Sequence, residues 1–148
     1  MHILLTTCTA RKRTDAALLP AIDRYVDPRI EHAASWAAQH ERPLMIFSGV
    51  YGLLAASDPI PYYDHALEAG EVAAAADALA ARITALGIDT VSALLEPRSA
   101  AGWAPYHDAL VRGCQLAGVR LVVLHWDPRQ QRLSNAVGDR RPEGRPSS

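Results

Sequence analysis

Residues 43–54 read PLMIFSGVYGLL, an apolar run followed by two glycines that flank a valine and a tyrosine. The apolar run predicts a buried strand over residues 44–47. Glycine accepts positive φ and lets a ligand or another backbone approach closely. We therefore predict a ligand-facing loop after this strand, with Ser48, Gly49 and Tyr51 as contacts and the two leucines as an anchor to the core. A tight turn with a buried tyrosine is the alternative.

Further apolar runs and helical patterns extend this picture along the chain. The predicted strands are residues 3–7, 44–47, 90–95 and 120–126. The predicted helices are residues 28–40, 67–86 and 105–117, with a short or broken helix within 15–25. Because strands alternate with helices, we predict an α/β fold, a three-layer α/β/α domain with a four- or five-stranded, mainly parallel sheet. The centre of the last strand, residues 121–124, is expected to be buried.

Length and composition predict one ordinary globular domain. The chain has 148 residues, of which 49% are hydrophobic and 21% charged, and its formal net charge is -1. We place the single α/β domain at residues 1–138. Residues 139–148 are polar and rich in arginine and proline, which predicts a disordered tail. The near-neutral charge excludes a global electrostatic footprint for nucleic acid, so any basic site must be local.

The sequence shows no targeting or metal-binding signal. No apolar run approaches the roughly 18 to 20 residues that span a bilayer, and the first residues lack the basic flank of a signal peptide. We therefore predict a cytoplasmic protein without membrane contact. Cys8 and Cys114 lie far apart without CxxC spacing, so we expect reduced thiols, with Cys114 in the core, and neither a metal nor a cofactor.

Polar side chains follow each predicted strand. The clusters are residues 8–14 after the first strand, 48–51 after the second, Glu96 and Arg98 after the third, and His125 and Asp127 after the fourth. A parallel sheet places its ligand at the carboxyl ends of its strands. We therefore expect the four clusters to form one ligand-binding rim.

The loop after the first strand has the groups that hold a phosphate or carboxylate. Thr9, Arg11, Lys12 and Arg13 supply a hydroxyl and three cations. Neither GxxxxGK[ST] nor GxGxxG is present, and Cys8 to Arg13 is one residue short of the Cys-x5-Arg loop of cysteine phosphatases. A solvated basic loop is the alternative interpretation.

Cys8 has two interpretations. A thiol near three cations has a lowered pKa and can act as a nucleophile. A small buried thiol at the end of a strand is the commoner case. The sequence leaves both open.

Other polar groups are candidates for binding a planar ring or moving protons. Tyr51, Tyr62 and Tyr63 can stack on an unstacked base or simply pack on the domain. The candidate catalytic groups are Cys8, Asp64, Glu96 and His125, with Asp127 beside the last. A carboxylate can stabilise positive charge or activate water while a histidine helps a base to leave. Each of these groups is equally compatible with a surface charge or a helix cap.

Three segments resemble one known family. They are CTARK at residues 8–12, SGVYGLL at 48–54 and PYYD at 61–64. Together they resemble a family of small bacterial α/β proteins of uncharacterised function that is labelled peroxide-stress YaaA-like, over about the first half of the chain. Val50 stands where the family often has lysine, and Tyr63 is an additional residue before Asp64. The resemblance implies a stress-response role and a fold related to nucleobase-processing enzymes of the uracil-DNA glycosylase type.

These observations predict a small enzyme that acts on a nucleoside, nucleotide or related anionic substrate and cleaves or exchanges an N-glycosidic bond. The basic loop is expected to hold the anion, Tyr51 and Tyr62 to stack on the ring, and Asp64 or Glu96 to supply the carboxylate. One alternative is a non-catalytic nucleic-acid-binding stress protein, and a second is a thiol catalyst or redox sensor that uses Cys8. The expected partner is a small anionic or nucleobase-containing ligand; nucleic acid and a second copy of the chain remain open as partners.

Overall fold

The computed structural model describes residues 1–129, and its main sheet has five strands in the order β4-β3-β1-β6-β7. The parallel strands are β1 (His2–Thr7), β3 (Leu44–Ser48), β6 (Thr90–Leu95) and β7 (Arg120–His125). The edge strand β4 (Gly52–Ala55) pairs antiparallel with β3. The predicted α/β fold with a mainly parallel sheet is confirmed. The predicted tail, residues 139–148, lies outside the described residues.

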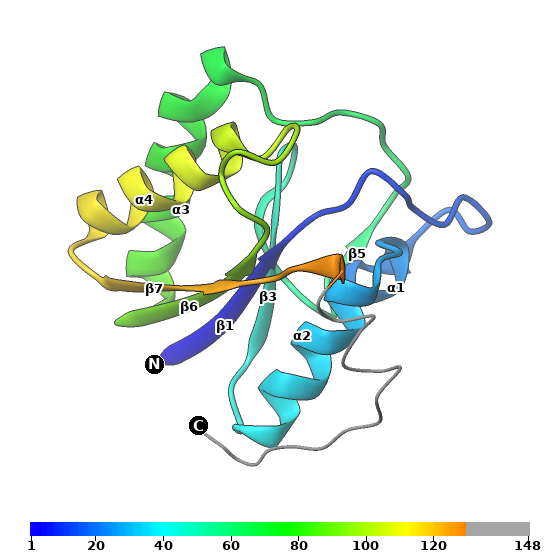
Figure 1. Cartoon of the computed structure of the whole chain (residues 1–148), viewed down its shortest axis with the longest axis horizontal. Coiled ribbons are helices and arrows are strands. Elements are labelled where there is room, and N and C mark those ends of the chain that lie inside the picture. The colour runs from blue at the N-terminus through cyan, green and yellow to red at the C-terminus, as the bar shows by residue number, and fades with distance from the viewer. Residues whose placement is uncertain (130–148) are drawn as a thin grey trace.

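Helices cover both faces of this sheet (Figure 1). On one face, α3 (Val72–Leu86) and α4 (Ala104–Ala117) enclose a core that includes Leu79 and Leu110. On the other face, Ala33 and Ala37 of α2 (Pro28–Gln39) pack against Leu4 of β1. The central strand β1 is covered on both sides, so residues 3–7 are buried throughout. The continuous apolar run that predicted this strand is the expected pattern for such a position.

The helix bounds follow the local signals in the sequence. The Asp27 carboxylate accepts a hydrogen bond from the Arg29 N–H at 2.8 Å, which caps α2 as expected. The helix predicted from residue 67 begins with a short 3-10 turn, η1 (Ala69–Glu71), and continues as α3. No helix within residues 1–129 is both long and apolar enough to cross a membrane.

Two short strands join the loops beside the sheet. β2 (Leu19–Pro20) pairs antiparallel with β5 (Pro59–Ile60), and the four-residue helix α1 (Ala21–Arg24) follows β2 directly. The fully buried Arg24 donates to the carbonyls of Arg13 at 2.6 Å, Ala16 at 2.9 Å and Ile60 at 3.1 Å. One buried cation therefore holds the basic loop and the proline-rich loop together.

The segment after Ser48 differs from the prediction of a loop. Ser48 pairs with Gly52 across a tight turn, and Leu53 and Leu54 lie in β4. Gly52 has a φ of 72°, which favours glycine at this position. Both leucines are buried, as an anchor to the core requires, but they reach the core from an edge strand. Two leucines are too short an apolar run to predict a strand by themselves.

The last strand is less buried than predicted. Residues 121–124 of β7 are half-buried, whereas residues 91–95 of β6 are fully buried. β7 stands at the edge of the sheet and pairs only with β6 within the described residues. An apolar run of this length is typical of both central and edge strands, so the sequence does not distinguish the two positions.

Candidate functional site

A cavity of about 360 Å³ lies at the carboxyl ends of β1 and β6, where the strand-end rule places a ligand. Four segments line it: the loop after β1, the start of α2, the residues before η1, and the loop between β6 and α4. The lining residues are Thr7, Cys8, Thr9, Ala10, Arg11, Lys12, Asp27, Arg29, Asp64, His65, Ala66, Glu96, Ala101, Gly102, Trp103 and Tyr106.

The cavity brings together about half of the residues that the sequence singled out. The residues in the lining are Cys8, Thr9, Arg11, Lys12, Asp64 and Glu96. The residues outside the lining are Arg13, Ser48, Gly49, Tyr51, Tyr62, Tyr63 and His125. The first group comes from loops after β1 and β6 and from the proline-rich segment, so one site collects residues that are distant in sequence.

Several of the residues outside the lining have other surroundings. Arg13 pairs with Asp15 at 2.7 Å, on the exposed side of the basic loop. Tyr51 and Tyr62 are 41% and 48% exposed, and neither lines the cavity. His125 ends the edge strand β7 and is exposed. None of these four side chains touches the space in which the cavity residues meet.

Ser48 and Tyr63 instead form a partly buried series of hydroxyl hydrogen bonds with Tyr25. The Ser48 hydroxyl accepts from the N–H groups of Val50 and Tyr51 at 3.1 and 3.0 Å, which uses both of its lone pairs. Its own hydrogen is therefore donated to the Tyr63 hydroxyl at 2.7 Å. Tyr63 in turn donates to the Tyr25 hydroxyl at 2.6 Å.

The two tyrosines of this hydrogen-bond network keep their phenolic protons at neutral pH. Burial raises the pKa of Tyr25 to about 12 and also raises the pKa of Tyr63. The Lys12 ammonium lies 4.7 Å from the centre of the Tyr63 ring, within cation–π range. The hydroxyl network therefore holds the Tyr63 ring that Lys12 contacts, and Lys12 itself lines the cavity.

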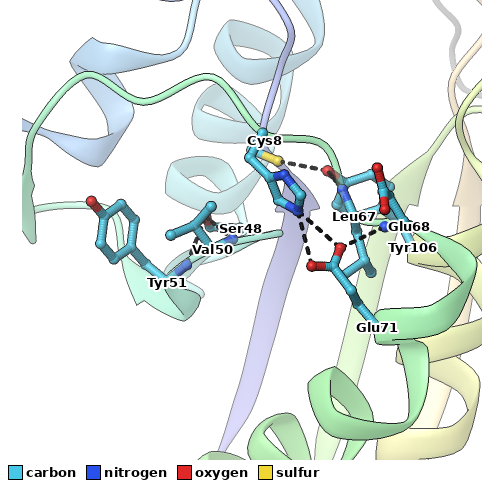
Figure 2. A network of polar contacts seen from close by, with 9 residues as sticks. Cys8, Ser48, Val50, Tyr51, Leu67, Glu68, Glu71 and Tyr106 are labelled. Carbon is cyan, nitrogen blue, oxygen red and sulfur yellow. Dashed lines mark hydrogen bonds and ion pairs between the residues drawn. The ribbon is translucent and has the colours of Figure 1, made fainter.

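Cys8 contacts a second buried phenol, Tyr106. The Cys8 thiol donates to the Tyr106 hydroxyl with an S···O distance of 3.4 Å, and that hydroxyl also accepts from the Leu67 N–H at 3.0 Å (Figure 2). Burial, and after it the nearby Cys8, raise the pKa of Tyr106, so the phenol keeps its proton. The Tyr106 hydroxyl therefore joins the β1 loop to the segment before η1.

Gly49 allows this junction to form. A Cβ added at Gly49 would lie 2.9 Å from the Leu67 nitrogen and 3.1 Å from the Tyr106 hydroxyl. Both distances are shorter than ordinary contacts, and the nearer atom belongs to the backbone. The glycine predicted to meet a ligand is thus in close contact with the wall of the cavity instead.

Substitution of Gly49 by alanine is expected to destabilise the fold by about 1–3 kcal/mol, the usual cost of an added methyl in a filled space. Urea denaturation measures the change. Gly70→Ala is the matched control, because a Cβ at Gly70 meets no atom within 4 Å. That control should be neutral or slightly stabilising. Equal free energies of unfolding for the two variants would show that Gly49 is not in close contact.

Arg29 is the main residue of the site that the sequence did not single out. It is 2% exposed and lines the cavity, and its guanidinium carbon lies 4.8 Å from the centre of the Trp103 ring. One terminal nitrogen, Nη1, donates to Thr6 Oγ1 at 2.5 Å and to the Thr7 carbonyl at 2.9 Å. Burial lowers the pKa of Arg29, and the negative charges of Asp27 and Glu96 oppose this effect.

Two of the carboxylates in the lining differ in their surroundings. Glu96 follows β6 and is half-buried, and its carboxylate makes no hydrogen bond to any of residues 1–129. Asp64 lies in the proline-rich segment and is exposed. A half-buried carboxylate without partners in a cavity is better suited to act on a substrate than an exposed one.

His65 and Glu71 form an ion pair at the edge of the cavity. The His65 Nε2 lies 2.9 Å from Glu71 Oε1, and the same oxygen accepts from the Glu68 N–H at 2.9 Å. Figure 2 shows Glu71 turned toward the Glu68 backbone. The bond to Glu71 raises the pKa of His65, while the Glu68 N–H and then His65 lower the pKa of Glu71.

The two shifts set the pH range of this pair. The raised value for His65 means that its contribution to stability is complete below the ordinary pKa of 6.5 and is lost as the pH rises through the folded-state pKa. The lowered value for Glu71 means that its contribution is present above 4.5 and is lost as the pH falls through the folded-state pKa. His65 Nδ1 has no hydrogen-bond partner within residues 1–129.

Comparison of the chain with protein-family models, with curated proteins and with solved structures gave no match. The resemblance to the YaaA-like family therefore stays a prediction. Within residues 1–129, no group of three or more His, Cys, Asp or Glu side chains is arranged to hold a metal ion.

Proposed function

We propose that the protein is a small enzyme that binds a nucleoside, nucleotide or related anionic compound in the cavity and cleaves or exchanges its N-glycosidic bond. The main supporting observation is that the half-buried Glu96 and the cations Arg11 and Lys12 line the same cavity, which has a volume of about 360 Å³. Cavities of roughly 300 Å³ and above hold small ligands. The resemblance to the YaaA-like family, which implies a fold related to nucleobase-processing enzymes, favours the same class of substrate.

In the proposed reaction, Glu96 and His65 each transfer one proton. The bond between the sugar C1′ and the base nitrogen breaks, and the base leaves with the bonding electrons. A water oxygen bonds to C1′, and Glu96 accepts the proton that this water loses. His65, whose pKa is raised, supplies a proton to the departing base from Nδ1. His65 thus takes the role that the sequence suggested for His125.

A melting-temperature screen tests the choice of ligand. The panel contains nucleosides, nucleotides, ribose 5-phosphate and single-stranded DNA. A ligand present at about 100 times its Kd is expected to raise the melting temperature of this chain by about 5 °C or more. Stabilisation by nucleotides or nucleosides supports the proposal. Stabilisation by DNA alone would favour the non-catalytic nucleic-acid-binding alternative, and no shift with any compound would contradict both.

A second candidate function is thiol catalysis by Cys8. The observation that favours it is the contact of Cys8 with Tyr106 inside the same cavity, because a buried phenol can donate to a sulfur that has lost its proton. This candidate function requires Cys8 and does not require Glu96. Turnover that Cys8→Ser abolishes and Glu96→Gln preserves would replace the carboxylate mechanism with this one.

A further inference from the structure

The guanidinium of Arg29 has donors that no atom of residues 1–129 uses. Nη1 gives both of its hydrogens to β1, and Nη2 makes a single long bond of 3.4 Å to the Cys8 carbonyl. The Nε atom is buried and has no hydrogen-bond partner within residues 1–129. Nε–H and the nearer Nη2–H lie side by side on one edge of the guanidinium. This edge is the one that receives the two oxygens of a carboxylate or phosphate in bidentate pairs.

The charge of Arg29 also lacks an ion-pair partner in the part of the chain that the structure describes. Asp27 and Glu96 are near enough to act on its pKa, but no carboxylate within residues 1–129 lies within 4.0 Å of its nitrogens. Asp27 uses its Oδ1 to accept the capping N–H of Arg29. A buried cation without an ion pair is costly to the fold. A ligand that supplies the negative charge would offset the cost of keeping the Arg29 guanidinium buried.

The surroundings of Arg29 hold this edge in place. The face of the guanidinium stacks on Trp103, and Nη1 is fixed by the Thr6 hydroxyl and the Thr7 carbonyl. These contacts leave the group little freedom to rotate. A fixed planar donor loses little entropy on binding an anion, which favours affinity.

Arg24 provides an internal comparison. It is also fully buried and also has an Nε without a partner within residues 1–129. Its terminal nitrogens, however, all donate to backbone carbonyls of two loops. Arg24 does not line the cavity, whereas Arg29 does. Of these two buried arginines, Arg29 is the one whose side chain borders a space that a ligand can enter.

We propose that Arg29 binds an oxyanion of the ligand, a carboxylate or a phosphate, through its guanidinium, with Arg11 and Lys12 completing the charge. This inference deepens the proposed function and rests on it in one respect, because it names the group by which the substrate is held. The binding itself does not depend on the reaction, so it is tested without turnover.

The direct test follows the Arg Nε–H resonances of the wild-type protein by NMR. Burial protects the Nε–H of Arg29 and of Arg24 from exchange with water. Addition of inorganic phosphate, or of acetate, should shift the Arg29 signal with a saturable curve and leave the Arg24 signal in place. Saturation with phosphate alone, or with acetate alone, identifies which oxyanion is bound. No shift of Arg29 with either anion, or an equal shift of both arginines, overturns the proposal.

A variant gives the second measurement. Arg29→Lys keeps the charge but loses the planar guanidinium with its several fixed donors, so phosphate or acetate affinity measured by calorimetry should fall at least about tenfold. Arg82→Lys is the control, because Arg82 is exposed on α3 and does not line the cavity. Unchanged affinity in Arg29→Lys overturns the proposal. If this variant does not fold, the wild-type NMR titration decides alone.

The two proposals fail separately. Anion binding at Arg29 without release of a base from any nucleoside or nucleotide removes the proposed reaction and leaves the inference standing. The inference fails and the reaction stands if Arg29→Lys releases base at the wild-type rate and the Arg29 Nε–H signal does not shift when anions are added.

Discussion

Replacement of Arg24 by leucine is expected to lower the free energy of unfolding by at least about 3 kcal/mol. The side chain is fully buried and donates to three carbonyls, those of Arg13, Ala16 and Ile60. Leucine removes the cost of burying a charge, and for a buried ion pair such an exchange is often neutral. Here the partners are carbonyls that stay in place and lose their donors. Each one left unsatisfied costs about 1–3 kcal/mol, which outweighs the gain.

Urea denaturation measures this change, and Arg82→Leu is its control. Arg82 is exposed and makes one long bond of 3.5 Å, to the Leu53 carbonyl. A substitution there should stay within about 0.5 kcal/mol of the wild type. The account of Arg24 is wrong if its variant is as stable as that of Arg82. A destabilised Arg24→Leu should also bind anions less well, because the basic loop and the proline-rich loop lose their shared anchor.

Much of the fold could be predicted from local patterns. The buried strand at residues 90–95 has the bounds of its apolar run, and α2 begins after Asp27 because aspartate followed by proline is a strong helix start. Positions that depend on distant partners could not be predicted. Whether Leu53 and Leu54 sit in a loop or an edge strand depends on pairing with β3. The half-burial of residues 121–124 depends on which strand lies at the edge.

The candidate site could be predicted where a strand end leads directly into it. Cys8, Lys12 and Glu96 follow β1 and β6, so the rule for parallel sheets brings them to one cavity. The same rule also pointed to His125, which pairs with Leu95 at the end of β6, but its side chain is exposed and does not line the cavity. Residues that reach the cavity from helices gave no such signal.

Arg29 had a signal that could have been used. It is the second residue of α2, and a cation in the first turn opposes the positive end of the helix dipole. Such a residue is unfavourable unless other contacts hold it, and here Trp103 and the end of β1 do so. His65 was hidden for a different reason. Its partner Glu71 is six residues away in an irregular segment, where no periodicity aligns side chains.

The second large effect concerns Glu96 and the reaction itself. Glu96→Gln keeps the shape of the side chain and removes its ability to accept a proton. Turnover should fall at least about 100-fold, the usual contribution of a positioned acid or base. Asp77→Asn is the matched control, because Asp77 is exposed on α3 and lies outside the cavity. Because His65 must be protonated, the rate should fall as the pH rises through its raised pKa, and Glu71→Gln should move that fall to lower pH.

The central claim is tested most directly by chromatographic measurement of free base released from nucleosides and nucleoside 5′-monophosphates. The account predicts release by the wild type and by Asp77→Asn, and at least about 100-fold slower release by Glu96→Gln. No release above that in buffer, or equal rates for Glu96→Gln and the wild type, would contradict it.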